Sequence, residues 1–233
     1  MDVLISKLNS KFSLVNSNTK PLVINCVPGT GKSTFIRELI TGRFSLRGLY
    51  CRRARFQNLT GRYIKPFKGE VEEDKFCLLD EYQVADSGSF WKFVAIFGDP
   101  QQNFLTKSFP ASYICNLSHR FGSETAEYLR KSGIDVHANK SDKLSIEHIF
   151  SGKLIGTILA FERPVIKLLN SHNCQFKRPE EVRGCTFDKV SFVTVGSGYK
   201  ECEKHLAYIC VTRHTEELKI LSANVPNTTC RLF

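Results

Sequence analysis

The sequence predicts an α/β protein whose strands form mainly parallel sheets in two halves of the chain. Short apolar runs alternate with helical or loop-like stretches along all 233 residues, and several runs end in polar residues, which is typical of parallel strands buried on both faces. The composition is 42% hydrophobic and 24% charged, which is ordinary for a soluble globular protein. Wholesale disorder, collagen-like repeats and a coiled coil are therefore excluded.

Five apolar runs predict the strands of the first half. They cover residues 21–27, 48–52, 75–82, 93–100 and 112–117. The stretch 10–16 reads as the end of a helix or a loop, and the segment FIRELI after the first strand is a good helix start. Strands of this length, separated by helices and loops, predict an α/β layer structure.

The second half repeats this pattern. Strands are predicted at 133–138, 153–161, 190–196 and 217–223, and helices at 121–132, 163–172 and 199–214. The natural seam lies around 116–121, so we expect two domains, 1–116 and 117–233. Halves of this size are small but feasible domains.

The net charge of +10 is concentrated in one segment. Residues 43–68 carry eight of the ten excess positive charges and no acidic residue. A basic excess of this size indicates an acidic partner, either nucleic acid or an anionic membrane surface.

Cysteine usage and hydropathy bear on the compartment. The nine cysteines are odd in number and none has C-x-x-C spacing, so neither a zinc site nor a disulfide framework is expected, and the redox environment is predicted to be cytosolic. No apolar stretch approaches 18 residues, so integral membrane insertion is not expected.

A glycine-rich segment follows the first predicted strand and matches the later part of a phosphate loop. Its backbone N–H groups and the following helix N-terminus would hold nucleotide phosphates. The strict pattern requires glycine at position 26, where Cys26 stands, and the alternative is a simple glycine turn. The predicted nucleotide-binding residues are Pro28, Gly29, Thr30, Gly31, Lys32, Ser33 and Thr34.

Two later strands end in polar residues that suit nucleotide hydrolysis. Asp80 would hold Mg²⁺ together with Ser33, and Glu81 would orient and deprotonate the attacking water. Gln102 would contact the γ-phosphate or that water. The alternatives are solvated carboxylates at a strand end and, for 97–102, a type I turn with Asp and Pro in favoured positions.

Six blocks in this order resemble a known family, the superfamily 1 RNA helicases of plus-strand RNA viruses. The blocks are PGTGKST at 28–34, LLDEYQ at 78–83, FGDPQQ at 97–102, and the segments 117–122, 181–190 and 211–214. Within that family the short chain resembles the triple gene block movement proteins of potexvirus-like plant viruses. The likeness spans about 21–222, and it departs from the pattern at Cys26 and at Arg183, where glutamine is usual.

The resemblance implies two RecA-like P-loop lobes that form a helicase core. It implies ATP, or another NTP, and Mg²⁺ as ligands, with the first lobe supplying three catalytic residues, Lys32, Glu81 and Gln102. The second lobe would supply Arg120 and Arg213, which would stabilise charge on the γ-phosphate. Without the block context, either arginine would be read as part of a surface salt bridge.

Single-stranded RNA is the predicted acidic partner. The basic segment 43–68 interleaves five aromatic residues with its cations, and rings that stack on bases beside guanidinium groups that hold phosphates suit RNA. The alternative is a solvated positive face whose aromatics are core. The predicted RNA-binding residues are Arg52, Arg53, Arg55, Arg62 and, in the block 181–190, Thr186.

The resemblance also implies a biological role. It implies transport of viral RNA between cells through plasmodesmata, suppression of host RNA silencing, and a host cytoplasmic location. Other viral movement proteins, coat protein, host silencing factors and a second copy of the chain are the implied protein partners. Two alternatives stay open: an RNA-binding movement and suppressor protein with incidental NTPase activity, and a P-loop kinase of small molecules.

Overall fold

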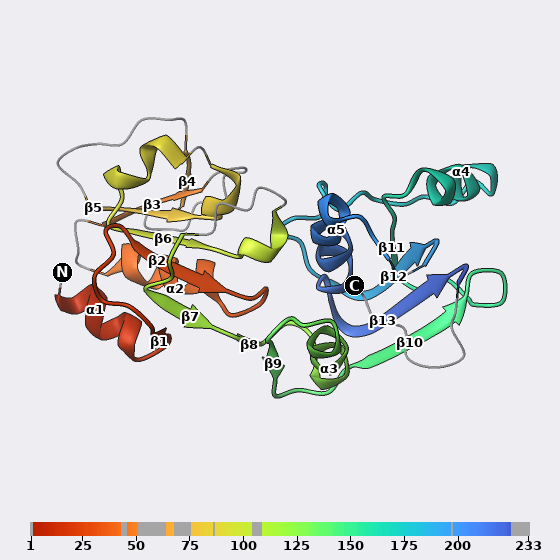
Figure 1. The fold of residues 1–233 in the computed structure, drawn as a ribbon, viewed down its shortest axis with the longest axis horizontal. Helices are drawn as coiled ribbons and strands as arrows, with labels where there is room; N and C mark the ends of the chain where they lie inside the picture. The colour runs from red at the N-terminus through yellow and green to blue at the C-terminus, as the bar shows by residue number, and fades with distance from the viewer. Residues whose placement is uncertain are drawn as a thin grey trace. The chain divides into compact units, whose positions relative to one another are not determined.

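The protein forms two compact units in a computed structural model, residues 1–115 and 116–233 (Figure 1). The division falls one residue before the boundary expected from the sequence. The structure describes residues 2–42, 46–50, 64–67, 76–85, 87–103, 109–196 and 198–224.

The first unit is built on a seven-stranded sheet in the order β1-β7-β2-β6-β5-β3-β4. All neighbours are parallel except β1, which runs antiparallel to β7 at one edge. The predicted parallel α/β fold is therefore confirmed. The strands are β1 (Ser13–Leu14), β2 (Leu22–Cys26), β3 (Leu46–Tyr50), β4 (Lys65–Pro66), β5 (Phe76–Asp80), β6 (Ala95–Gly98) and β7 (Tyr113–Cys115).

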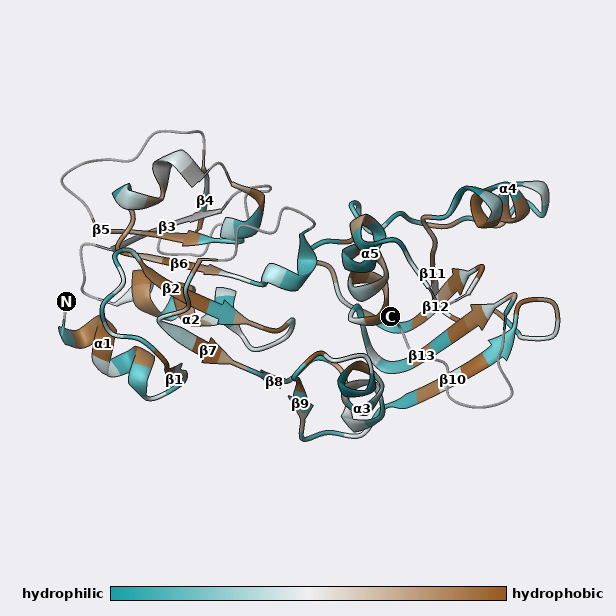
Figure 2. Ribbon diagram, viewed as in Figure 1, coloured by the Kyte–Doolittle hydropathy of each residue, from teal (hydrophilic) through white to brown (hydrophobic). Residues whose placement is uncertain are grey.

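Both faces of this sheet are buried, because neighbouring residues of a strand point to opposite faces. On one face Ile24 and Phe97 pack with helices α1 (Asp2–Asn9) and α2 (Lys32–Thr41). On the other face Val23 and its neighbours pack against 3₁₀ turns η1 (Tyr82–Val84) and η2 (Ser87–Lys92). Figure 2 shows β2 as largely hydrophobic, as a central strand buried on both faces should be.

The second unit contains a four-stranded parallel sheet in the order β10-β13-β12-β11. A separate two-stranded parallel ladder joins β8 to β9. The helices and strands of the second unit are β8 (Leu117–Ser118), α3 (Ser123–Lys131), β9 (His137–Ala138), β10 (Lys143–His148), β11 (Thr157–Leu159), α4 (Arg163–Ser171), β12 (Phe187–Thr194), α5 (Glu201–Val211) and β13 (His214–Ser222).

Three differences from the predicted elements have simple causes. Strand β10 was not predicted, because KLSIEH alternates polar and apolar residues and is not an apolar run. The predicted helix 199–214 ends at Val211, since β13 already begins at His214. The predicted strand 112–117 divides into β7 and β8, which belong to different sheets. Among the described residues, no helix is both long and apolar enough to cross a bilayer.

A buried pair organises the start of β13 in the second unit. His214 Nε2 lies 3.0 Å from Asp142 Oδ2, and both side chains are fully buried. The other carboxylate oxygen accepts the backbone N–H of Glu124 at 3.0 Å, in the first turn of α3. Burial on its own would raise the pKa of Asp142, but the hydrogen bonds from His214 and Thr125 outweigh it and hold that pKa at about 2. The pair therefore connects α3 to the residue that follows Arg213.

We expect Asp142→Asn to destabilise the protein at neutral pH by about 2 kcal/mol. A carboxyl group whose pKa is lower in the folded than in the unfolded protein stabilises the fold at pH values above the unfolded pKa. This contribution is lost as the pH falls from near 3.8 towards about 2. Urea unfolding curves measured at several pH values should thus show the gap between wild type and variant closing over that interval. Glu127→Gln is the matched control, since this carboxylate pairs with Lys131 at an exposed site and such pairs contribute at most about 1 kcal/mol. A gap that stays constant with pH would contradict the assignment.

Candidate nucleotide-binding site

The loop after β2 has the backbone of a phosphate-binding turn. It spans residues 27–31, between the end of β2 and the start of α2. Gly29 and Gly31 both have left-handed φ angles, 84° and 82°, which a side chain would disfavour. Gly31 is the N-cap residue and has no side chain with which to cap the helix, so the first N–H groups of α2 can bind an anion.

Lys32 is held beneath this loop. Its side chain is 7% exposed, and its Nζ donates to the carbonyl oxygens of Cys26 and Val27, each at 3.2 Å. An ammonium group has three protons, so one remains for a phosphate oxygen. The geometry pre-positions the cation at the loop.

The Cys26 side chain packs into the core on the α1 and α2 face of the sheet, where it is 3% exposed. Burial raises the pKa of its thiol to about 12, although the nearby Lys32 ammonium opposes the rise. The residue belongs to β2 and has no positive φ, so the position does not require glycine. Its contribution to the loop is the backbone carbonyl that accepts from Lys32.

Ser33 and Asp80 come together at the first turn of α2 and the last residue of β5. The Ser33 hydroxyl donates to Asp80 Oδ2 at 2.7 Å, and Asp80 is fully buried. Its other oxygen accepts the backbone N–H of Glu81 at 3.0 Å. A hydroxyl and a carboxylate are oxygen ligands that suit Mg²⁺, which keeps several waters and phosphate oxygens in its shell. The residues present therefore fit the metal that the sequence predicts.

Glu81 sits immediately after β5 in a left-handed conformation, with φ 60°. This region is unusual for a residue other than glycine, and strain of this kind concentrates at functional sites. Its carboxylate accepts a hydrogen bond from Gln83 Nε2. In turn, Gln83 Oε1 accepts the backbone N–H of Asp99 at 3.3 Å. The Gln83 side chain thus joins the end of β5 to the turn after β6.

That turn, η3 (Pro100–Gln102), is capped by Asp99, whose carboxylate also holds the Gln102 side chain. Asp99 Oδ1 accepts the backbone N–H of Gln101 at 3.1 Å and Oδ2 accepts Gln102 Nε2 at 2.9 Å. Both Asp99 and Gln102 are nearly fully buried. Gly98 is needed here, because a Cβ at that position would lie 2.3 Å from Gln83 Oε1. The segment is therefore a capped turn whose glutamine is fixed inside the first unit.

Sequence reasoning named neither Gln83 nor Asp99 as a site residue. Both lie inside two of the family blocks, LLDEYQ and FGDPQQ. The available signal was a polar residue two or three positions from a candidate catalytic group, in a segment that also contains a buried aromatic residue. The hydrogen-bond partners of Gln83 and Asp99 depend on the pairing of β5 with β6, and this pairing cannot be read from the sequence alone.

In the second unit, Arg120 and Arg213 meet at one residue, Thr212. Arg120 Nη1 donates to the Thr212 carbonyl at 3.1 Å, and Arg213 Nη2 donates to the Thr212 hydroxyl at 3.1 Å. Arg213 Nε also donates to the Ile209 carbonyl at 3.1 Å, at the end of α5. Arg213 is 1% exposed, so a phosphate contact by this guanidinium would require the side chain to become accessible.

The predicted RNA residues are only partly described by the structure. Thr186 is exposed directly before β12, and the next residue, Phe187, donates its N–H to the Arg213 carbonyl at 2.9 Å. The structure therefore brings the block 181–190 and the block 211–214 together. Arg52, Arg53, Arg55 and Arg62 lie outside the described residues.

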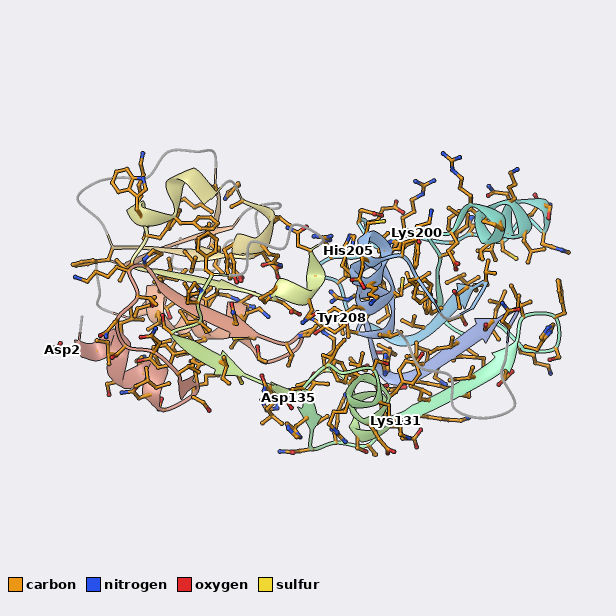
Figure 3. The ribbon with its side chains drawn as sticks, in the orientation of Figure 1. Asp2, Lys131, Asp135, Lys200, His205 and Tyr208 are labelled. Atoms are coloured by element: carbon orange, nitrogen blue, oxygen red, sulfur yellow. The ribbon has the colours of Figure 1, made fainter. Side chains whose placement is uncertain are left out.

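The structure also describes Phe67 of the basic segment and Arg183 of the block 181–190. Phe67, one of the five aromatics of the basic segment, packs edge-on against Phe93 with ring centroids 5.4 Å apart, and it is partly buried against the core. Arg183, which stands where the family usually has glutamine, acts on His205 of α5 (Figure 3). The pKa of His205 is lowered, first by burial of the ring and second by the positive charge of Arg183.

The comparisons with known proteins agree with the predicted blocks. Residues 22–222 match the model of the viral superfamily 1 RNA helicase core domain. The chain is 35% identical to the movement and silencing protein TGBp1 of Chrysanthemum virus B, over 98% of this chain and 99% of that protein. It is 37% identical to the protein of the same name from Poplar mosaic virus (isolate ATCC Pv275), over 94% and 96%.

Solved structures show the same fold at low sequence identity. The complex of arterivirus nonstructural protein 10, a helicase, with DNA aligns with a TM-score of 0.54 and 14% identity over 87% of this chain. The PRRSV helicase aligns with a TM-score of 0.54 and 14% identity over 88% of this chain. This chain covers only about half of each of those helicases, 54% and 47%.

We predict that Cys26→Gly, which restores the strict loop pattern, lowers the free energy of unfolding by about 1–3 kcal/mol, because it removes a buried side chain and places glycine in a strand. Nucleotide affinity should change less than about twofold, since the loop uses only the backbone of this residue. Urea unfolding and calorimetric titration with MgATP measure the two effects. A gain in affinity of tenfold or more would show that the cysteine impairs the loop.

Proposed function

Since the chain belongs to the viral superfamily 1 RNA helicases and, within them, to the TGBp1 movement and silencing proteins, we propose that it is an RNA-stimulated NTPase of helicase type. The observation that carries this proposal is the convergence of Lys32, Ser33 and Asp80 on the loop between β2 and α2. These three groups supply a cation for phosphate and two oxygen ligands for a metal.

The proposed reaction is hydrolysis of the bond between the β- and γ-phosphates of ATP or another NTP. The loop N–H groups and Lys32 bind the phosphates, and Ser33 and Asp80 hold Mg²⁺, which when bound neutralises phosphate charge. Glu81 takes a proton from the attacking water. Gln83 keeps that carboxylate oriented through its hydrogen bond, and Gln102 contacts the γ-phosphate or the water.

The second unit contributes charge stabilisation in this proposal. Arg120 and Arg213 would act on the γ-phosphate as negative charge redistributes in the transition state. Because both guanidinium groups bond Thr212, a movement of either one towards the γ-phosphate would break a hydrogen bond to that residue. This supports a coupling between hydrolysis and the conformation of the segment 211–214.

The proposed acidic partner is single-stranded RNA, bound through the basic segment with Arg52, Arg53, Arg55 and Arg62 and through Thr186. By kinship with TGBp1 proteins, the proposed biological role is movement of viral RNA between cells and suppression of silencing, in the host cytoplasm and at plasmodesmata. Other viral movement proteins, coat protein, host silencing factors and further copies of the chain are the proposed protein partners.

A second candidate is an RNA-binding movement and silencing protein whose NTPase activity is incidental. The buried, internally bonded state of Arg213 and the fixing of Gln102 by Asp99 favour slow turnover. A small-molecule kinase has no comparable support, because both halves of the chain match the helicase family.

We expect Lys32→Ala to lower NTP turnover by about 10²-fold or more, because removing one preorganised charge from a phosphoryl-transfer site has this effect. Phosphate release should be measured with and without single-stranded RNA, in wild type and variant. Equal turnover in the two proteins would refute the catalytic assignment. A low wild-type rate that RNA does not raise would instead favour the second candidate.

The triple variant Arg52→Ala/Arg53→Ala/Arg55→Ala should bind single-stranded RNA more weakly and with less salt dependence. Each lost phosphate contact reduces the slope of log K against log salt by about 0.7, so the slope should fall by about 2. The matched control removes three exposed cations of the second unit, Arg163, Lys167 and Lys200, the last of which precedes α5 (Figure 3). An unchanged slope in the first variant would remove this segment from the RNA site.

A further inference from the structure

A second lysine stands beside the phosphate loop. Lys11 lies in the connection between α1 and β1, before the residues 22–222 that match the helicase core. Its Nζ is 3.7 Å from the point that a Cβ on Gly31 would occupy. Among the described residues, no other atom beyond the chain neighbours of Gly31 comes within 4 Å of that point. The ammonium therefore occupies otherwise open space at the last residue of the loop.

The backbone that carries Lys11 is firmly anchored. Its N–H donates to the Leu8 carbonyl at 3.0 Å, and the next residue, Phe12, is buried with its ring 5.0 Å from that of Phe35. Asn9, two residues earlier, accepts from the Tyr113 hydroxyl at 3.0 Å. The turn is thus fixed on the core of the first unit, and the exposed Lys11 side chain extends from it.

The contacts of the Lys11 charge within the fold are weak. Its Nζ lies 5.4 Å from the centre of the Phe35 ring, a cation–π contact that contributes about 0.5–1 kcal/mol at an exposed site. Among the described residues it forms no ion pair with a carboxylate. The site already holds the cation of Lys32, and like charges at one loop repel each other unless an anion lies between them.

We propose that Lys11 is a further nucleotide-binding residue that contacts the phosphate chain of a nucleoside di- or triphosphate bound at the loop. This rests on the proposed NTPase function. Gly31 belongs to the part of the loop that surrounds the α- and β-phosphates, so the contact serves ATP and ADP alike and is independent of the base. Lys11 acts on affinity and has no role in the chemical step.

The test is calorimetric titration of the full chain with MgATP, MgADP and MgUTP. Lys11→Ala should raise the dissociation constant about three- to tenfold for all three nucleotides, the range expected for one partly exposed charge-assisted contact. Lys11→Arg should retain most of the affinity, and Lys11→Glu should lose more than the alanine variant. The matched control is Lys20→Ala, an exposed lysine two residues before β2 and so at the opposite end of that strand from the loop.

Steady-state kinetics of Lys11→Ala should show a raised KM with kcat nearly unchanged. Its Tm should fall by no more than a few degrees, because the lost contact with Phe35 is worth only about 0.5–1 kcal/mol. Unchanged affinity in Lys11→Ala, or losses that differ between ATP and UTP, would overturn the inference while the proposed function stood. If wild type itself binds no nucleotide, the proposed function fails and the inference fails with it.

Discussion

The hydrogen bond between Ser33 and Asp80 joins two segments that lie 47 residues apart in the sequence, and the rest of the first unit is arranged around it. A fully buried carboxylate is costly unless it is hydrogen-bonded or paired. Asp80 meets this requirement with the Ser33 hydroxyl and the Glu81 N–H. The pairing of β5 with β6 and of β6 with β2 brings these groups to one edge of the sheet. The same edge carries the loop that holds Lys32, so the candidate site follows from satisfying one buried charge.

The second unit also contains a buried carboxylate with hydrogen-bond partners, near the beginning of β13 rather than at the end of a strand. Here the buried carboxylate is Asp142, which bonds His214 and the first turn of α3. Thr186 and Arg213 lie at the beginnings of β12 and β13, whereas Asp80 lies at the end of β5. In both units, buried polar contacts between segments distant in sequence fix the positions of the motif residues.

Long apolar strands and motif blocks were predictable because each depends on local sequence. Runs such as 21–27 and 93–100 contain β2 and β6, since parallel strands buried on both faces must be apolar throughout. Strand β10 did not follow this rule, because polar and apolar residues alternate along KLSIEH and none of its positions is fully buried. The end of α5 was misplaced because the polar segment 212–214 contains no glycine or proline to mark a helix end, while pairing with β12 commits His214 to a strand.

The sequence by itself determined the order of elements, the phosphate loop and the family blocks, because these are written in residue type and spacing. Only the tertiary structure decided that Cys26 serves through its carbonyl, that Gln83 bridges Glu81 and Asp99, and that Arg213 is bonded inside its own unit. It also decided that Lys11 reaches Gly31 across twenty residues of sequence. Each of these depends on which strands and helices become neighbours, and that choice is made by the packing of the whole core.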